Sequence, residues 1–335
     1  MDNRVRVYEV GPRDGLQNEP NLVPTATKAR FIELLADAGL REIEATSFVA
    51  PRAIPQLADA DELLAGILGT PGRRAVGGDE PGLRAVGVYG PGRRTTRVRY
   101  PVLVPNMRGF ARAEAAGADA LAVFTAATDA FTTANIGMTV RESLEAFAPV
   151  LERAGALGWW RRGYVSTAFG CPYDGRVEPA RAVDVALRLL DLGVDEVCFG
   201  DTIGVGVPAQ VAALTGLAVS AGVPLERIAY HFHDTRGTAL ANVAAGLDAG
   251  VRCFDASAGG TGGCPYAPGA AGNLATEDLI YFLDASGWES GVSLDGVLGA
   301  ARFIANALGR PLATKVGQAG GWDPASADPI GAPSE

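Results

Sequence analysis

The chain has 335 residues, of which 48% are hydrophobic and 20% are charged, a composition typical of a folded globular protein. Its formal net charge of −9 disfavours a nucleic-acid-binding role, because binding phosphates requires a basic surface. Charged residues interrupt every apolar run well before the ~18 residues that a membrane span needs, and the polar start of the chain is unlike a signal peptide.

Short apolar runs alternate with longer apolar patterns at helical spacing along most of the chain. Eight of the short runs are predicted to be β-strands: Val5–Val10, Glu42–Thr46, Val102–Val104, Ala120–Phe124, Gly163–Thr167, Glu196–Phe199, Ile228–Phe232 and Cys253–Asp255. Glycine suits the left-handed position after a helix, and four helical patterns end in a glycine shortly before a strand pattern: Gly39, Gly117, Gly193 and Gly250.

Eight strand–helix units in succession predict a parallel sheet closed into an α/β TIM barrel, the (β/α)8 fold. We therefore expect a single catalytic barrel domain over residues 1–335. An open, doubly wound sheet is the alternative. No Gly-x-Gly-x-x-Gly follows the first strand, which disfavours a dinucleotide-binding domain.

Two segments depart from this repeating pattern. Residues 70–99 hold three Pro-Gly-x-Arg elements, seven arginines and few bulky apolar residues, and we expect a flexible insertion on the barrel face away from the chemistry. A docking element for an acidic partner is the alternative for this segment. After the eighth unit comes one more helical pattern, at about Leu294–Leu308, and the Gly/Pro/Ala-rich residues 317–335 are predicted to be a loose tail.

Polar residues follow or end most of the predicted strands. In barrels of this class the catalytic groups lie at the C-terminal ends of the strands, so these positions predict an active site at the barrel mouth. They are Arg13 and Asp14 at the first strand, Glu44 and Ser47 at the second, Asp201 and Thr202 at the sixth, His231 and His233 at the seventh, and Cys264 and Asn273 after the eighth.

The two histidines, His231 and His233, are the only ones in the chain. Residues two apart on a strand point to the same face, so both imidazoles are expected to point into the barrel mouth. Two adjacent imidazoles suit a divalent metal, and a hydrogen-bonded pair of core histidines is the alternative. The pattern favours a metal site.

A carboxylate should join the two neutral imidazoles, because they do not balance a dication. Asp14 is expected to be this ligand, since the first strand of a closed barrel lies next to the eighth and near the seventh. Asp201 and Asp255 are the competing candidates. A ligand set of this kind suits Mg²⁺ or Mn²⁺ better than structural zinc.

Three further residues each have a catalytic and a structural interpretation. Arg13 is either a fixed cation that stabilises an oxyanion or a member of an ion pair at the barrel rim. Cys264 lies in a Gly-rich loop and could act as a nucleophile or an acid/base, although the same Gly-Cys-Pro-Tyr sequence occurs at 170–173. Asn273 could be only a neighbour of the helix start at Thr276.

The four cysteines, Cys171, Cys198, Cys253 and Cys264, show no Cys-x-x-Cys spacing. Together with the absence of an export signal, this predicts reduced thiols and a cytoplasmic location. Cys198 and Cys253 lie in apolar strand-like runs and are expected to be packing residues.

Five motifs together resemble the 3-hydroxy-3-methylglutaryl-CoA lyase family of metal-dependent barrel enzymes. The resemblance extends from about residue 5 to residue 320, without residues 70–99. The motifs are Val10–Glu19, Thr46–Val49, Gly200–Gly206, Gly262–Ala267 and Gly272–Asp278.

This resemblance implies that Asp14, His231, His233 and Asn273 hold a divalent metal cation, Mg²⁺ or Mn²⁺. It implies catalytic roles for Arg13, Glu44, Asp201 and Cys264, and it favours Cys264 over the cysteine at 171. Ser47, Thr202 and Arg13 are expected to contact an acyl-CoA substrate. A homodimer and a role in leucine degradation are also family expectations.

The reaction implied is a retro-Claisen cleavage that yields acetyl-CoA and acetoacetate. A base, His231, Asp201 or Glu44, removes the proton of the tertiary hydroxyl. The carbon–carbon bond then breaks, Arg13 stabilises the enolate oxygen, and Cys264 or a water that it positions protonates the enolate carbon.

The chain departs from the family pattern at two places that bear on the substrate. Arg236 replaces an aromatic residue and is expected to add a contact to a carboxylate, and Thr132-Thr133-Ala134 replaces a lysine-rich stretch. A related 3-hydroxy-3-alkylglutaryl-CoA, and a specialised pathway, are therefore alternatives. The alternative functions are a Claisen-type condensing synthase that acts on a 2-oxo acid and a non-enzymatic scaffold.

Overall fold

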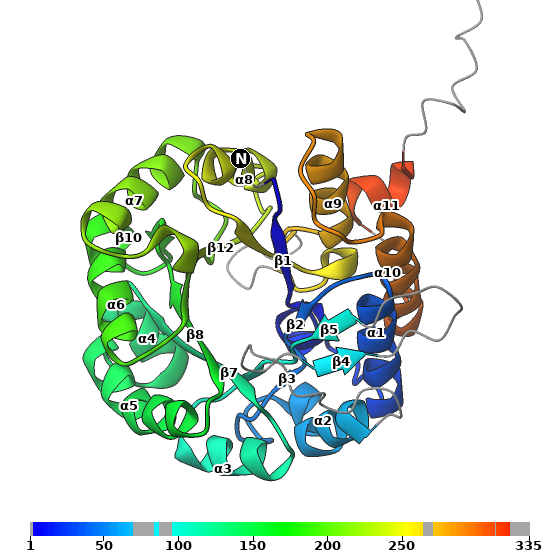
Figure 1. Cartoon of the computed structure of the whole chain (residues 1–335), viewed down its shortest axis with the longest axis horizontal. Helices are drawn as coiled ribbons and strands as arrows, with labels where there is room; N and C mark the ends of the chain where they lie inside the picture. The colour runs from blue at the N-terminus through cyan, green and yellow to red at the C-terminus, as the bar shows by residue number, and fades with distance from the viewer. Residues whose placement is uncertain (1–2, 70–83, 87–95, 264–270, 312, 322–335) are drawn as a thin grey trace, which may run out of the picture.

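Parallel strands form a closed ring surrounded by helices in the computed structural model, which describes residues 3–69, 84–86, 96–263, 271–311 and 313–321 (Figure 1). The order around the sheet is β2-β1-β13-β12-β11-β8-β7-β6-β3. The strands are β1 (Arg6–Glu9), β2 (Glu42–Ile43), β3 (Thr46–Ser47), β6 (Val102–Leu103), β7 (Ala120–Ala126), β8 (Trp160–Ser166), β11 (Glu196–Asp201), β12 (Ile228–Phe232) and β13 (Cys253–Ala256).

The second predicted strand is divided into β2 and β3, which pair with different neighbours. β2 pairs with β1 and β3 pairs with β6, both in parallel. Between them, the Glu44 N–H donates to the Glu9 carbonyl over 2.8 Å and the Ala45 N–H donates to the Pro101 carbonyl over 2.9 Å. These bonds close the ring, so the predicted TIM barrel and its eight strand positions are confirmed.

The helices form the outer layer of the ring, and the left-handed conformation predicted after four of them is present. Gly39, Gly117, Gly193 and Gly250 have φ values of 105°, 87°, 90° and 95°. No helix among the described residues is long and apolar enough to cross a membrane. The helices are α1 (Thr25–Asp37), α2 (Ala60–Gly69), α3 (Met107–Ala115), α4 (Asp129–Ile136), α5 (Val140–Ala156), α6 (Pro179–Asp191), α7 (Pro208–Ser220), α8 (Ala239–Asp248), α9 (Thr276–Ala285), α10 (Leu294–Leu308) and α11 (Lys315–Ala319).

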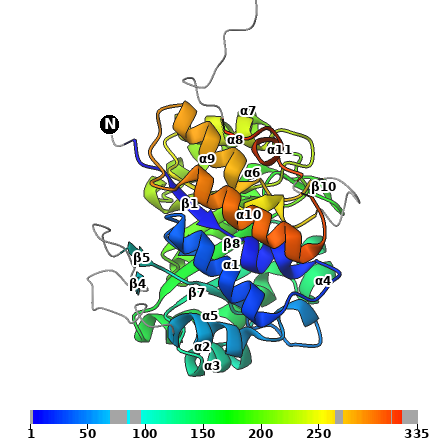
Figure 2. The same ribbon diagram turned by 90° about the vertical axis from the view of Figure 1, so that its right-hand side faces the viewer.

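The segment 70–99 contributes a small antiparallel sheet and one end of it joins the barrel. β4 (Arg84–Val86) pairs with β5 (Thr96–Val98), and Figure 2 shows both on the side where the chain begins. Val98 is buried, and Arg99 forms an ion pair with Glu42. The expected flexibility concerns mainly residues 70–83 and 87–95, which lie outside the described residues.

The chain after the barrel packs on its outer layer. α10 has the bounds predicted for it and packs against α1 (Figure 2). Residues 317–319, which we expected to begin a loose tail, instead end helix α11. The Val316 N–H donates to the Asp278 carboxylate over 2.7 Å, which ties α11 to the start of α9.

We predict that Ile304→Ala lowers the free energy of unfolding by about 2–5 kcal/mol, because Ile304 lies on the buried face of α10 and none of its surface is exposed. The matched control is Asn306→Ala on the exposed face of the same helix, with an expected change within about 0.5 kcal/mol. Urea unfolding measures both. Equal effects of the two variants would show that α10 is not part of the core.

Candidate metal centre and active site

Asp14, His231 and His233 come together at the C-terminal mouth of the barrel. One potential ligand atom from each residue lies within 4.8 Å of the other two. The two imidazole rings are 5.2 Å apart between centroids and tilted by 53°. The order of the strands accounts for the cluster, because β1, which leads to Asp14, is separated from β12 only by β13.

Asn273 lies beside this cluster. One polar atom of Asn273 and one of His233 lack a hydrogen-bond partner in the described part of the chain and are available to a cation. The Asn273 Nδ2 group donates to Asp14 Oδ2 over 3.0 Å and to the Thr261 carbonyl over 3.1 Å. Asn273 Oδ1 and His233 Nδ1 are buried and have no hydrogen-bond partner within the described part of the chain. Buried polar atoms are nearly always satisfied, so this donor set of oxygen and imidazole atoms fits a divalent metal.

A five-residue π-helical turn, Gly11–Gly15, carries Arg13 and Asp14 into the mouth. The N–H groups of residues 13, 14 and 15 all donate to the Val10 carbonyl, over 2.7 to 3.1 Å. Close packing requires glycine at the end of the turn, because a Cβ on Gly15 would lie 2.2 Å from the Thr261 hydroxyl oxygen. The turn is therefore pressed against the segment that follows β13.

Glu9 lies beneath this turn and joins three segments. Its Oε1 accepts from the Gly11 N–H over 2.7 Å and from the Ala258 N–H over 3.0 Å, and its Oε2 accepts from the Thr276 hydroxyl over 2.7 Å. Burial raises the pKa of Glu9 from 4.5 to about 7, against the opposing effect of these hydrogen bonds. Glu9 thus holds the Arg13–Asp14 turn against the segment after β13 and against the start of α9.

Arg13 is a buried cation held between two carboxylates. Its Nε donates to Glu44 Oε1 over 2.7 Å and its Nη1 donates to Asp14 Oδ1 over 2.5 Å. The Tyr164 hydroxyl donates to the other Glu44 oxygen over 2.5 Å, and the Tyr164 ring centroid lies 5.7 Å from the Arg13 guanidinium. Burial acts to lower the pKa of Arg13, but Glu44 and Asp14 outweigh it, so the guanidinium stays charged.

The surroundings of Asp14 and His233 favour the forms of these two side chains that bind a metal. Burial acts to raise the pKa of Asp14, but Arg13 and the histidines outweigh it, and the pKa falls to about 2. Burial and the neighbouring His231 lower the pKa of His233 to about 3. An ionised carboxylate and a neutral imidazole are the ligand forms of these side chains.

Asp255 lies behind His231 and not in the cluster that faces the mouth. Its Oδ2 is 3.2 Å from His231 Nδ1, and its Oδ1 accepts from Arg162 Nη2 over 2.7 Å. Burial acts to raise the pKa of Asp255, but the Arg162 charge and His231 outweigh it and lower that pKa. Arg162 also contacts Glu196 through Nε over 3.1 Å.

Asp201 ends β11 and Thr202 directly follows it, and local hydrogen bonds hold both side chains. The two Asp201 oxygens accept from the Val205 and Gly206 N–H groups, each over 2.9 Å. Burial raises the pKa of Asp201, although these hydrogen bonds act to lower it. The Thr202 hydroxyl oxygen accepts from the Thr167 N–H over 2.8 Å. Thr167 has a φ of 54°, a strained conformation at the end of β8.

The remaining predicted site residues differ in how the structure places them. The buried Ser47 hydroxyl donates to the Leu103 carbonyl over 3.3 Å. Arg236 donates through Nη1 to the carbonyls of Ile203 and Gly204, over 2.7 and 3.0 Å, so it braces the turn after Asp201. Cys264 lies outside the described residues.

Segments on both sides of Cys264 reach the cluster. Gly263 and Ala271 form an isolated antiparallel bridge, and the Asn273 N–H donates to the Gly262 carbonyl over 3.3 Å. The competing cysteine, Cys171, is buried in β9 (Gly170–Cys171), and its Sγ accepts from the Thr128 hydroxyl over 3.1 Å. These contacts give Cys171 a packing role.

Three functional neighbours were not predicted from the sequence: Tyr164, which contacts Glu44, Arg162, which contacts Asp255, and Glu9, whose carbonyl accepts from the Glu44 N–H. Arg162 and Tyr164 are two residues apart on β8 and share its inward face. Polar side chains on the inward face of an apolar strand are the sequence feature that could have indicated Arg162 and Tyr164. Glu9, a charged residue near the end of the first predicted strand, shows the same feature.

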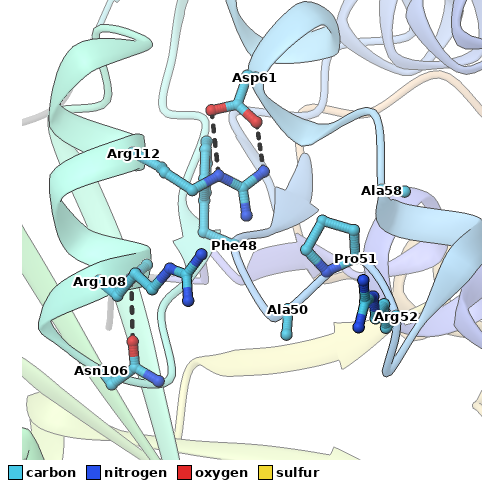
Figure 3. Close-up of a pocket in the computed structure, with 10 residues that line it drawn as sticks. Phe48, Ala50, Pro51, Arg52, Ala58, Asp61, Asn106, Arg108 and Arg112 are labelled. Atoms are coloured by element: carbon cyan, nitrogen blue, oxygen red, sulfur yellow. Dashed lines mark hydrogen bonds and ion pairs between the residues drawn. The ribbon is translucent and has the colours of Figure 1, made fainter.

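Two pockets lie away from this cluster. One of ≈ 700 Å³ opens between α3 and the segment after β3, where Arg112 forms an ion pair with Asp61 (Figure 3). The Arg112 guanidinium also lies 5.3 Å from the centroid of the Phe48 ring. The other, of ≈ 950 Å³, lies at the N-terminal ends of the strands and is lined by Arg6 and Glu196 among others. Neither pocket is lined by Asp14, His231, His233 or Asn273.

Comparison with known proteins places the chain among enzymes of one kind. Residues 4–304 match the HMGL-like protein family. The mitochondrial hydroxymethylglutaryl-CoA lyase of Mus musculus is 46% identical over 319 residues, which cover 95% of this chain and 90% of the mouse protein.

Two solved structures resemble the fold over almost its whole length. A hydroxymethylglutaryl-CoA lyase from Pseudomonas aeruginosa gives a TM-score of 0.85 at 42% identity and covers 95% of this chain and 98% of its own. An HMG-CoA lyase from Acinetobacter baumannii, in complex with coenzyme A and 3-methylmalate, gives a TM-score of 0.84 at 34% identity and covers 98% of each chain.

We predict that Glu9→Gln gains stability relative to wild type as the pH rises from 5 to 8. Glu9 has a raised folded-state pKa, so its contribution to stability is full below pH 4.5 and is lost as the pH rises through about 7. Glutamine does not titrate. The difference in unfolding free energy between the two proteins should therefore change by on the order of 2–3 kcal/mol between pH 5 and pH 8.

Urea unfolding of both proteins at the two pH values measures this shift, because the titration of every other group cancels in the difference. A difference in unfolding free energy that is the same at pH 5 and pH 8 would contradict the raised pKa of Glu9.

Proposed function

We infer that this chain, which belongs to the HMGL-like family, is a carbon–carbon lyase that cleaves 3-hydroxy-3-methylglutaryl-CoA to acetyl-CoA and acetoacetate. The single observation that carries the inference is the cluster of Asp14, His231 and His233 at the barrel mouth, with the Arg13 cation beside it. The lyases to which the chain is similar support the same reaction and do not favour the condensing synthase.

The metal centre of this proposal uses Asp14, His231, His233 and Asn273. The orphaned Asn273 Oδ1 and His233 Nδ1 atoms support it, as does the low pKa of Asp14. Oxygen-rich coordination favours Mg²⁺ or Mn²⁺. When bound, such a metal supplies Lewis acidity that lowers the pKa of the substrate's tertiary hydroxyl.

Asp201 is the best candidate to take the hydroxyl proton. Glu44 is committed to an ion pair with the Arg13 guanidinium and to a hydrogen bond from Tyr164, and His231 Nδ1 is engaged by Asp255. Each Asp201 oxygen accepts one backbone N–H and keeps a free lone pair, and burial raises its pKa. A raised pKa makes a carboxylate a better proton acceptor, and the protonated group can later return the proton.

Arg13 is proposed to stabilise the charge that forms as the carbon–carbon bond breaks. The bonding electron pair moves to the thioester fragment, which becomes an enolate, while the hydroxyl-bearing fragment becomes the ketone of acetoacetate. Glu44 and Asp14 hold the guanidinium in place, so it needs no reorganisation during the reaction. A proton delivered to the enolate carbon by Cys264, or by a water that it positions, completes acetyl-CoA.

Acyl-CoA binding is proposed for Arg13, Ser47, Thr202 and Arg236. The hydrogen bonds of Ser47, Thr202 and Arg236 within the protein favour an indirect contribution, through the shape of the loops that they brace. Four points stay predictions: the methyl substituent of the substrate in place of a longer alkyl group, the homodimer, the cytoplasmic location and the role in leucine degradation. The buried, unpaired thiols of Cys171, Cys198 and Cys253 support a reducing compartment.

Purified protein supplied with Mg²⁺ and 3-hydroxy-3-methylglutaryl-CoA is predicted to form acetyl-CoA and acetoacetate in equal amounts. Addition of EDTA should stop the reaction, and excess Mg²⁺ should restore it. Mass spectrometry follows both products. Bound metal without any product would refute this substrate, and turnover that persists in EDTA would refute the role of the metal.

His233→Ala is expected to lower kcat by about 10³-fold or more, because loss of a Lewis acid removes several kcal/mol of transition-state stabilisation. The matched control is Asp234→Asn, since the Asp234 carboxylate points away and accepts from the Ala239 N–H over 3.1 Å. The kcat of Asp234→Asn should stay within a few-fold of the wild-type value. Near-normal turnover in His233→Ala would remove His233 from the proposed metal centre.

A further inference from the structure

We propose that Asp255, anchored by Arg162, is a positioning residue that orients the His231 ring and places its proton on Nδ1. This leaves Nε2 unprotonated and available as the metal-binding nitrogen. The inference rests on the proposed function, because it assigns the residue that prepares one ligand of its metal centre. Among the described residues, the side-chain hydrogen-bond partners of Asp255 are Arg162, Cys198 and His231, so it contacts none of the other proposed ligands.

The strand pairing of the barrel fixes the relation between the two residues. β12 and β13 are parallel neighbours, and His231 is the direct partner of Asp255 in their register. Both side chains therefore leave the sheet toward the barrel interior at the same level. The resulting distance of 3.2 Å between His231 Nδ1 and Asp255 Oδ2 is that of a hydrogen bond.

Arg162 determines which of the two groups donates this hydrogen bond. Its Nη2 donates to Asp255 Oδ1 over 2.7 Å, and neither side chain has any exposed surface. A carboxylate held by a buried guanidinium acts as an acceptor only, so the imidazole must donate. A neutral imidazole carries one proton, and Nδ1 must hold it.

Arg162 itself is held firmly from three sides. Its guanidinium lies 3.8 Å from the centroid of the Tyr8 ring and 5.0 Å from that of Tyr164. Glu196 contacts its Nε over 3.1 Å. The position of Asp255 is therefore set by the barrel interior and does not depend on substrate or metal.

The substitution Asp255→Asn converts this arrangement into a test of the tautomer. Arg162 has only donors, so it should hold the carbonyl oxygen of the new amide. The amide nitrogen then takes the place of Oδ2 and donates to His231 Nδ1. That reversal forces the imidazole proton onto Nε2, the nitrogen that must be free to bind a metal.

Nitrogen NMR of the metal-free protein reads the tautomer directly, because the chain has only two histidines. Protein labelled with ¹⁵N-histidine is measured at a pH high enough that both rings are neutral, and His233→Gln assigns the signals. In wild type we expect His231 to be protonated at Nδ1, and in Asp255→Asn at Nε2. A wild-type His231 protonated at Nε2 would overturn the proposal, whether or not the variant folds.

Binding of Mn²⁺, followed by electron paramagnetic resonance, supplies the second readout. Loss of a carboxylate behind a metal-binding histidine typically weakens binding 10- to 100-fold, and we expect an increase of about this size in the Kd of Asp255→Asn. The matched control is Glu196→Gln, which also removes a buried carboxylate from Arg162 but does not contact His231. Its Kd should stay within about threefold of wild type.

The two readouts separate the positioning role from the proposed function. Equal weakening of Mn²⁺ binding in both variants would mean that Asp255 acts only through the charge of Arg162, and would overturn the positioning role. If wild-type protein binds no Mn²⁺, the proposed metal centre fails, and the wild-type tautomer alone still decides whether Asp255 positions His231. Thermal unfolding and circular dichroism establish that each variant is folded.

Discussion

Arg162 lies in the centre of the barrel with none of its side chain exposed, between Glu196 on one side and Asp255 on the other. A charge buried in this way is costly unless it is paired and hydrogen-bonded, and each of its partners is paired again. Glu196 contacts Arg6 toward the N-terminal ends of the strands, and Asp255 contacts His231 toward the mouth. A row of alternating charges therefore runs along the barrel interior, and loss of any member leaves its neighbours uncompensated.

A second row meets the first at the mouth. Tyr164 donates to Glu44, Glu44 holds Arg13, and Arg13 holds Asp14. Because these groups are fixed by one another before any substrate arrives, the charges at the site are already in their working forms. Asp14 is ionised, Arg13 is charged and His233 is neutral, as the directions of their pKa shifts require. Preorganisation of this kind is the main way in which enzymes stabilise developing charge.

Local sequence patterns predicted most of the barrel, because strand and helix periodicities depend on nearby residues. The eight strand positions and α10 follow from them, and the two histidines were visible because residues two apart share a face. The Arg162–Asp255 pair joins residues 93 apart in sequence and the Tyr164–Glu44 bond joins residues 120 apart, so only the strand register brings them together. The division between β2 and β3 also depends on different strand partners, which periodicity does not encode.

The most direct test of the proposed metal centre is a crystal structure of the protein soaked in Mn²⁺, with anomalous diffraction data collected near the manganese edge. We expect one strong anomalous peak between Asp14, His231, His233 and Asn273, with Arg13 next to it and Asp255 outside the coordination sphere. A peak elsewhere, for example among the acidic residues at the N-terminal ends of the strands, would contradict it. So would an Mn²⁺ ion coordinated by Asp255 in place of Asp14.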